Sequence, residues 1–133
     1  MTQTLTELTI PIITSKIETT IDFETIITKA IDETLSTLGE NVKQSVYVQL
    51  KNNFGIRKEE IYLNIELFTK ALEIMFGKSS LLIKIKIISR LHKQVGTFSF
   101  KTEKRELCLE EYVAALQAYI DRQNMIYKSL DYS

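Results

Sequence analysis

Few side chains in this sequence are of types that catalyse reactions or bind metals. The only histidine is His92 and the only cysteine is Cys108. A nucleophile needs an activating base close by, and no serine or cysteine stands at a recognisable spacing from His92. Cys108 precedes a predicted helix, whose N-terminus can lower a thiol pKa, but its neighbours Leu107 and Leu109 favour a small buried residue. The sequence therefore offers no nucleophile with its base.

Paired carboxylates at Glu59–Glu60 and Glu110–Glu111 are the other candidate chemistry. Paired acids can act as acid and base, or hold a divalent ion. However, neighbours in a helix point about 100° apart, and both pairs stand where a predicted helix begins, where negative charge stabilises the helix dipole. The four glycines are isolated, so no phosphate-binding loop is present. We expect a protein that is not an enzyme and has no metal or cofactor site.

Charge is balanced over the whole chain but uneven along it. Lysine plus arginine and aspartate plus glutamate are 17 each, so no global field attracts nucleic acid. No acid lies between Glu73 and Glu103, and within this stretch Lys86, Arg90 and Lys93 fall on one face of a predicted helix. Many duplex-binding proteins present such a face, although it is more often solvated or paired with acids. Nucleic-acid binding is therefore an alternative function.

Length and composition predict one folded domain over residues 1–133. Apolar residues make up 44% and charged residues 26%, which is ordinary globular usage. No apolar stretch approaches the roughly 20 residues that span a bilayer, and a single cysteine fits a reducing compartment. Abundant isoleucine, lysine and glutamate without tryptophan resemble proteins of hot-living organisms. We expect a cytoplasmic protein with no membrane partner.

Three helices are predicted in the first part of the chain. Each begins at a residue whose side chain can cap a helix and ends at or near a glycine. Asn41 with Gln44 resembles a capping box. The predicted helices run from Asp22 to Leu38, from Asn41 to about Asn53, and from Asn64 to Gly77.

Two segments have the alternation of strands. Residues 1–20 hold a β-branched run around Pro11, which predicts an extended arm or edge strand. Residues 97–101 alternate Phe98 and Phe100 with polar neighbours, which predicts a short strand that could pair with the arm.

Residues 79–95 are ambiguous, because Ile83, Ile85 and Ile87 alternate with lysines as in a strand. The length of the segment exceeds that of a typical strand and favours a helix. The predicted inward face is Leu81, Ile85, Ile88, Leu91 and Val95.

The last predicted helix, residues 109–130, follows a near-heptad spacing and would be roughly 33 Å long. A second, tyrosine-rich stripe widens its apolar surface. This surface predicts a homodimer or another protein partner, through Tyr112, Leu116, Tyr119, Ile120 and Ile126.

A pattern of helix ends and core positions covers residues 22 to about 91. It comprises Thr37, Leu38, Gly39, Val42, Tyr47, Leu50, Asn53, Phe54, Gly55, Ile56, Glu59, Glu60, Ile61, Asn64, Glu66, Phe68, Leu72, Ile74 and Gly77. The pattern resembles a small archaeal helical family, the Nitrosopumilus-type output domain, found alone or attached to signalling proteins. The resemblance implies an archaeal origin and a regulatory or scaffolding role.

Together these patterns predict an all-α bundle of about five helices, with at most a small two-stranded element formed by the arm and residues 97–101. The expected function is a non-catalytic protein-interaction, regulatory or output module that self-associates.

Overall fold

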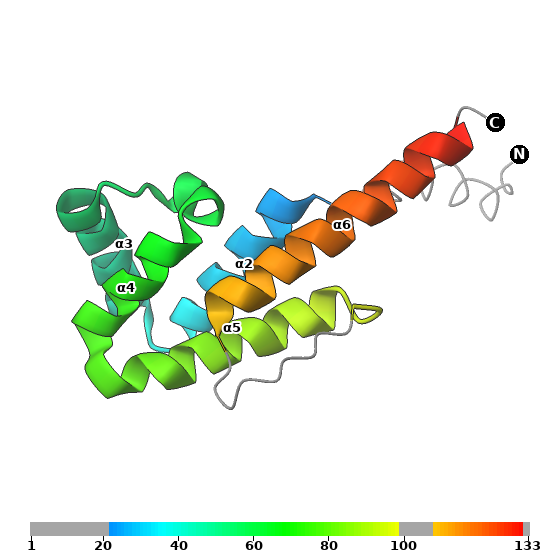
Figure 1. Ribbon diagram of the computed structural model, residues 1–133. Helices are drawn as coiled ribbons and strands as arrows, with labels where there is room; N and C mark the ends of the chain where they lie inside the picture. The colour runs from blue at the N-terminus through cyan, green and yellow to red at the C-terminus, as the bar shows by residue number, and fades with distance from the viewer. Residues whose placement is uncertain (1–21, 99–107, 132–133) are drawn as a thin grey trace, which may run out of the picture. The chain divides into compact units, whose positions relative to one another are not determined.

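The computed structural model describes residues 22–98 and 108–131. Within these ranges the backbone forms five α-helices, two short 3-10 helices and no strand (Figure 1). The elements in chain order are α2 (Phe23–Ser36), α3 (Glu40–Phe54), the 3-10 helix η1 (Lys58–Leu63), α4 (Ile65–Phe76), the 3-10 turn η2 (Gly77–Ser79), α5 (Ser80–Gln94) and α6 (Leu109–Asp131).

The chain divides into two compact units. One is Phe23–Gln117, and the other combines Met1–Asp22 with Ala118–Ser133. The Phe23–Gln117 unit holds α2 to α5 and the beginning of α6. One domain over 1–133 stays a prediction.

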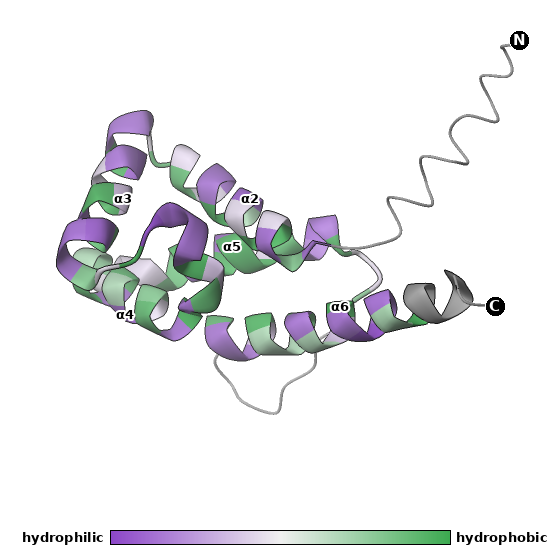
Figure 2. Ribbon diagram, turned by 90° about the horizontal axis from the view of Figure 1, so that it is seen from above, coloured by the Kyte–Doolittle hydropathy of each residue, from purple (hydrophilic) through white to green (hydrophobic). Residues whose placement is uncertain are grey.

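Helix α2 lies beside α5, and this pair forms the centre of the Phe23–Gln117 unit (Figure 1). The buried residues of α2 recur at helical spacing, so they share one face. At the end of α5, the Gln94 side chain donates a hydrogen bond to the Ile26 carbonyl, near the start of α2, at 3.1 Å. Figure 2 shows hydrophobic and hydrophilic positions alternating along each helix. The buried apolar residues of the unit are Phe23, Ile27, Ala30, Ile31, Leu35, Val46, Leu50, Ile56, Ile61, Phe68, Ala71, Leu72, Ile83, Ile87, Ile88, Leu91, Val95, Phe98, Leu109, Tyr112, Val113 and Leu116.

The link between α2 and α3 differs from the predicted capping box. Helix α2 ends at Ser36, and Gly39 adopts a φ of 106°, a conformation that favours glycine. This turn brings the chain into α3 at Glu40, one residue before the predicted cap at Asn41. The Gln44 amide then donates to the Glu40 carboxylate at 3.1 Å, instead of returning to Asn41.

The prediction of a cap at Asn64 is right in position and wrong in contact. Helix α4 begins at the next residue, but the Asn64 amide donates backward to the Glu60 carbonyl at 2.9 Å. The residues before it form η1, where the Glu60 carboxylate accepts a hydrogen bond from the Arg57 backbone N–H at 3.1 Å.

Residues 80–94 form a helix, as their length predicts, but the helix buries a different stripe. Ile83 and Ile87 are 4% and 1% exposed, whereas Leu81 and Ile85 are 51% and 41% exposed. The predicted inward face is therefore wrong at Leu81 and Ile85 and right at its last three positions. The helix is rotated about its axis, because the apolar side chains of this segment form two overlapping stripes and α2 contacts only one.

The two-stranded element is not supported. Thr97 and Phe98 lie in a turn, in which the Phe98 N–H donates to the Val95 carbonyl at 3.0 Å. The Phe98 ring is buried and packs edge-to-face on Tyr112, with ring centroids 5.4 Å apart. The arm of residues 1–20 and residues 99–101 lie outside the described ranges. Within the described ranges, Phe98 is therefore a residue of the core that contacts α6, and its neighbourhood contains no strand.

The rotation of α5 predicts unequal costs for two isoleucines that are two positions apart. Ile87→Ala removes a fully buried side chain and should lower the free energy of unfolding by about 2–5 kcal/mol. Ile85→Ala removes a half-exposed one and should cost under about 1 kcal/mol. Urea denaturation of both variants measures this difference. A larger loss for Ile85→Ala would mean that the predicted stripe, and not the observed one, faces the core.

Candidate interaction surface

The outward side of α5 carries three apolar side chains that the sequence analysis assigned to the core or overlooked. Leu81, Leu82 and Ile85 are 51%, 58% and 41% exposed. Residues spaced three and four apart share a helix face, so Leu82 and Ile85 lie in line with Lys86, Ser89 and Lys93. We define the α5 face as Leu81, Leu82, Ile85, Lys86, Ser89 and Lys93.

The predicted basic residues divide into one that is paired and two that are not. The Arg90 guanidinium lies 3.5 Å from the Glu33 carboxylate of α2. Lys86 is half-buried and Lys93 is exposed, and neither forms an ion pair with a described residue. Arg90 therefore helps to hold α5 against α2, while Lys86 and Lys93 direct their charge to the α5 face.

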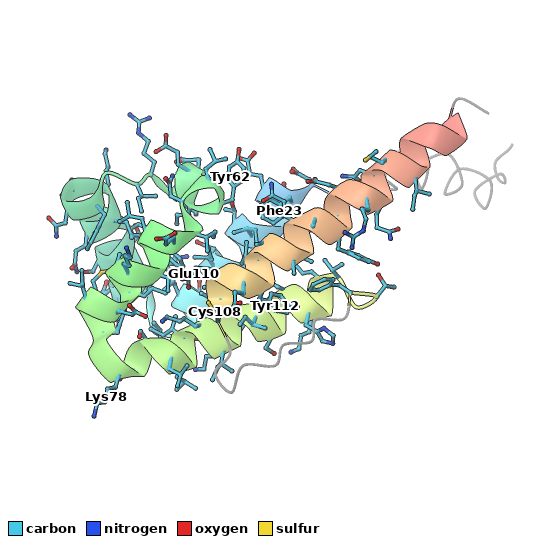
Figure 3. All side chains as sticks on the ribbon, viewed as in Figure 1. Phe23, Tyr62, Lys78, Cys108, Glu110 and Tyr112 are labelled. Carbon is cyan, nitrogen blue, oxygen red and sulfur yellow. The ribbon has the colours of Figure 1, made fainter. Side chains whose placement is uncertain are left out.

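Two further lysines, one in α5 and one in the preceding η2 turn, differ in their contacts. The Lys84 ammonium lies 2.6 Å from the Glu73 carboxylate of α4, and its side chain is only 12% exposed. Lys78 is exposed in η2, where Figure 3 shows it pointing away from the corner between α4 and α5. The acids Glu73 and Glu33 are thus engaged by Lys84 and Arg90. The exposed apolar residues lie between Lys78 on one side and Lys86 and Lys93 on the other.

The predicted self-association residues of α6 do not form one exposed surface. Tyr112 and Leu116 are 4% and 0% exposed and belong to the core of the Phe23–Gln117 unit. Ile120 is also buried, at 1%, and Tyr119 is half-buried. Of the five residues, only Ile126 is exposed, at 52%. The helical spacing of Tyr112 and Leu116 thus reflects the core of this unit.

A polar cluster joins α2, α3 and η1 on another side of the unit. The Tyr47 hydroxyl donates to the Asp32 carboxylate at 2.9 Å. The Lys58 and Lys43 ammonium groups lie 3.1 and 3.5 Å from the same carboxylate, and Lys58 also lies 5.0 Å from the centre of the Tyr47 ring. The cluster therefore links α2, α3 and η1 through polar contacts outside the apolar core.

These contacts change the pKa of the Asp32 carboxyl and of the Tyr47 phenol. Burial opposes the charge of Asp32, but the Tyr47 hydroxyl and the Lys58 and Lys43 ammonium groups outweigh it and lower the pKa of the carboxyl. Burial, and then the neighbouring Asp32 carboxylate, raise the pKa of the Tyr47 phenol far above its ordinary value. At neutral pH the cluster is a charged carboxylate held by a neutral phenol and two cations.

A shallow polar groove of about 320 Å³ lies beside the cluster, lined by Glu24, Thr25, Thr28, Lys29, Asp32 and Lys58. A second groove, of about 270 Å³, lies between α3 and α4 and is lined by uncharged residues: Asn41, Val42, Ser45, Val46, Gln49, Met75 and Phe76. Neither groove brings together groups that could act as a nucleophile and its base.

The remaining reactive side chains lie apart. His92 is exposed near the end of α5, and Cys108 is half-buried directly before α6. Glu110 and Glu111 stand in the first turn of α6 and Glu59 and Glu60 in that of η1, the helix-start positions that the sequence predicts. Within the described ranges no three His, Cys, Asp or Glu side chains gather closely enough to hold a metal ion. In the same ranges, no helix combines the length and apolarity needed to cross a membrane.

Comparison with protein-family models, with curated proteins and with solved structures finds no match for this chain. The resemblance of residues 22 to about 91 to the archaeal output-domain family stays a prediction.

The lowered pKa of Asp32 predicts a pH dependence of stability. A carboxylate whose pKa is lower in the folded state stabilises above its unfolded pKa, about 4, and this contribution is lost as the pH falls through the folded pKa. Asp32→Asn keeps an acceptor for Tyr47 but removes the charge. We expect the variant to be about 1 kcal/mol less stable than the native chain at pH 7, with a gap that narrows below pH 4.

Urea denaturation at several pH values measures this gap. The control is Glu59→Gln, an exposed position in the same η1 helix as Lys58. Its free energy of unfolding should stay close to that of the native chain at every pH. An Asp32→Asn penalty that persists undiminished at pH 2.5 would contradict a charge effect.

Proposed function

We propose that this chain is a non-catalytic protein-interaction module that contacts its partner through the α5 face. One observation carries the proposal: three large aliphatic side chains, Leu81, Leu82 and Ile85, are about half exposed on one side of a helix whose opposite side is buried. Single exposed leucines are ordinary, but adjoining apolar residues with a polar rim are typical of protein-binding surfaces.

The charges near these apolar residues support selective recognition of a partner protein. Along the chain Lys78 precedes the apolar residues and Lys86 and Lys93 follow them, and the nearby acids Glu73 and Glu33 are engaged by Lys84 and Arg90. Charged rims of this kind select partners and speed their approach. A regulatory or output role, as the family resemblance implies, is consistent with such a surface.

Nucleic-acid binding has weaker support. Of the predicted contacts Lys86, Arg90 and Lys93, the arginine is engaged by Glu33 at 3.5 Å. Leu81, Leu82 and Ile85 would lie against phosphates or water, where burial of apolar area contributes little. The net charge of the whole chain is zero, so no long-range field favours a polyanion.

Cross-linking tests the proposed surface. A photoreactive side chain in place of Ser89, at the middle of the α5 face, should give discrete protein adducts in an extract of the source cells. The adducts should disappear when Leu82→Ser and Ile85→Ser are added, because the apolar contact is then lost. Equal adduct yields from Ser45, an exposed serine of α3, or yields that survive the added serines, would rule out this surface.

Self-association is the second part of the proposal, and it now depends on Met125 and Ile126, which are 69% and 52% exposed. If these residues form the contact between copies, light scattering should give the mass of two chains, and Met125→Asp with Ile126→Asp should reduce it to one. A one-chain mass for the native protein at high concentration would remove this part of the proposal and leave the α5 face unaffected.

A further inference from the structure

We infer that the α5 face binds an acidic amphipathic helix of another protein, one that carries aliphatic residues at helical spacing between aspartates and glutamates. The inference depends on the proposed function and names the chemistry of its partner. It is drawn from the charges of the face, the arrangement of its apolar residues and the engagement of the neighbouring acids.

The α5 face is asymmetric along the helix. Its apolar residues occupy the first turns, at positions 81 to 85, and its cations, the half-buried Lys86 and the exposed Lys93, lie further along. From Leu82 to Lys93 the helix rises by roughly 16 Å. A partner helix of about three turns covers this length, with aliphatic residues over Leu82 and Ile85 and carboxylates over the lysines.

A second copy of this chain fits the face poorly. A two-fold axis places a surface against itself, so the lysines of one α5 face would meet a face that also has cations and contains no carboxylate. The acids that pair with α5, Glu73 and Glu33, already contact Lys84 and Arg90 at 2.6 and 3.5 Å. Like charges brought together across an interface oppose association. Among the described residues beside α5, these two acids are engaged, so an acidic partner protein is the source of complementary charge that we infer.

Lipid and nucleic acid fit less well than an acidic helix. A helix that lies in an anionic bilayer has an apolar side along most of its length, but the apolar part of the α5 face ends at Ile85 and continues with Lys86 and Ser89. A nucleic acid would satisfy the lysines and leave Leu81, Leu82 and Ile85 without apolar contact. Only a partner that is both apolar and acidic uses every residue of the face.

Binding of designed peptides to the full chain tests the inference. The first probe is a fluorescent peptide of 14 residues with leucines at i, i+3, i+4 and i+7 and glutamates elsewhere, held helical by a hydrocarbon staple on the side opposite the leucines. The second has lysines in place of the glutamates. Fluorescence anisotropy should give a measurable affinity for the acidic probe. The basic probe should bind at least about tenfold more weakly than the acidic one.

Charge reversal on the protein makes the test specific. Lys86→Glu with Lys93→Glu should weaken binding of the acidic probe by about tenfold or more and strengthen binding of the basic probe. Leu82→Ser should weaken the binding of both probes. The matched control is Lys51→Glu with Val48→Ser on α3, where the valine is 54% exposed; it should change neither affinity. All of these positions are at least partly exposed, and thermal unfolding of each variant checks that the fold is kept.

The outcomes separate the inference from the proposed function. If Leu82→Ser weakens binding but charge reversal does not, the face binds proteins and the acidic partner is wrong. If neither change matters, or if the acidic probe does not bind, the inference fails, and the Ser89 cross-linking result then decides the proposed function alone. Tighter binding of the native chain to phosphatidylserine vesicles or to duplex DNA than to the acidic probe, with the same dependence on Lys86 and Lys93, would also overturn it.

Discussion

Helix α5 has more apolar surface than one neighbour can cover, and this constraint shapes the rest of the molecule. Ile83, Ile87 and Leu91 lie against the inside of the unit, next to α2, and are nearly inaccessible to solvent. Once these residues are buried, helical geometry turns Leu81, Leu82 and Ile85 outward. The burial of one stripe stabilises the fold, and the same rotation exposes the other.

Ion pairs at the two edges of α5 fix this rotation. Lys84 reaches Glu73 of α4 on one edge, and Arg90 reaches Glu33 of α2 on the other. Surface pairs of this kind contribute little to stability individually, but both are formed in the observed rotation of the helix. They also remove two cations and two carboxylates from the outer surface, so that the α5 face keeps lysines and no acids.

The sequence predicts the helices well and their orientations less well. Helical spacing, capping residues and glycines identify α2, α3, α4, α5 and α6 within a few residues of their observed ends, because these signals are local. The rotation of α5 is not local: Leu81 and Ile83 have nearly the same hydrophobicity, and only the shape of the space beside α2 distinguishes them. The pairing of Arg90 with Glu33, 57 positions apart, also depends on packing that no local pattern contains.

The α6 stripe is a second case in which one pattern has two explanations. Tyr112, Leu116 and Ile120 recur as residues of a dimer interface would, yet all three are buried within the chain. Hydrophobic periodicity indicates that one side of a helix is buried. It does not show whether that side is buried by the same chain or by a partner. The polar cluster of Asp32, Tyr47 and Lys58 left no recognisable signal in the sequence, since its members come from three separate elements.

The short link between α2 and α3 has a consequence for how this sequence can drift over generations. A methyl group added at Gly39 would meet no atom within 4 Å, so space alone would admit many side chains there. The obstacle is the torsion of the chain, a φ of 106° that L-residues with a Cβ rarely adopt. Selection on descendants of this protein should therefore keep glycine at this corner for its backbone conformation and not for lack of space.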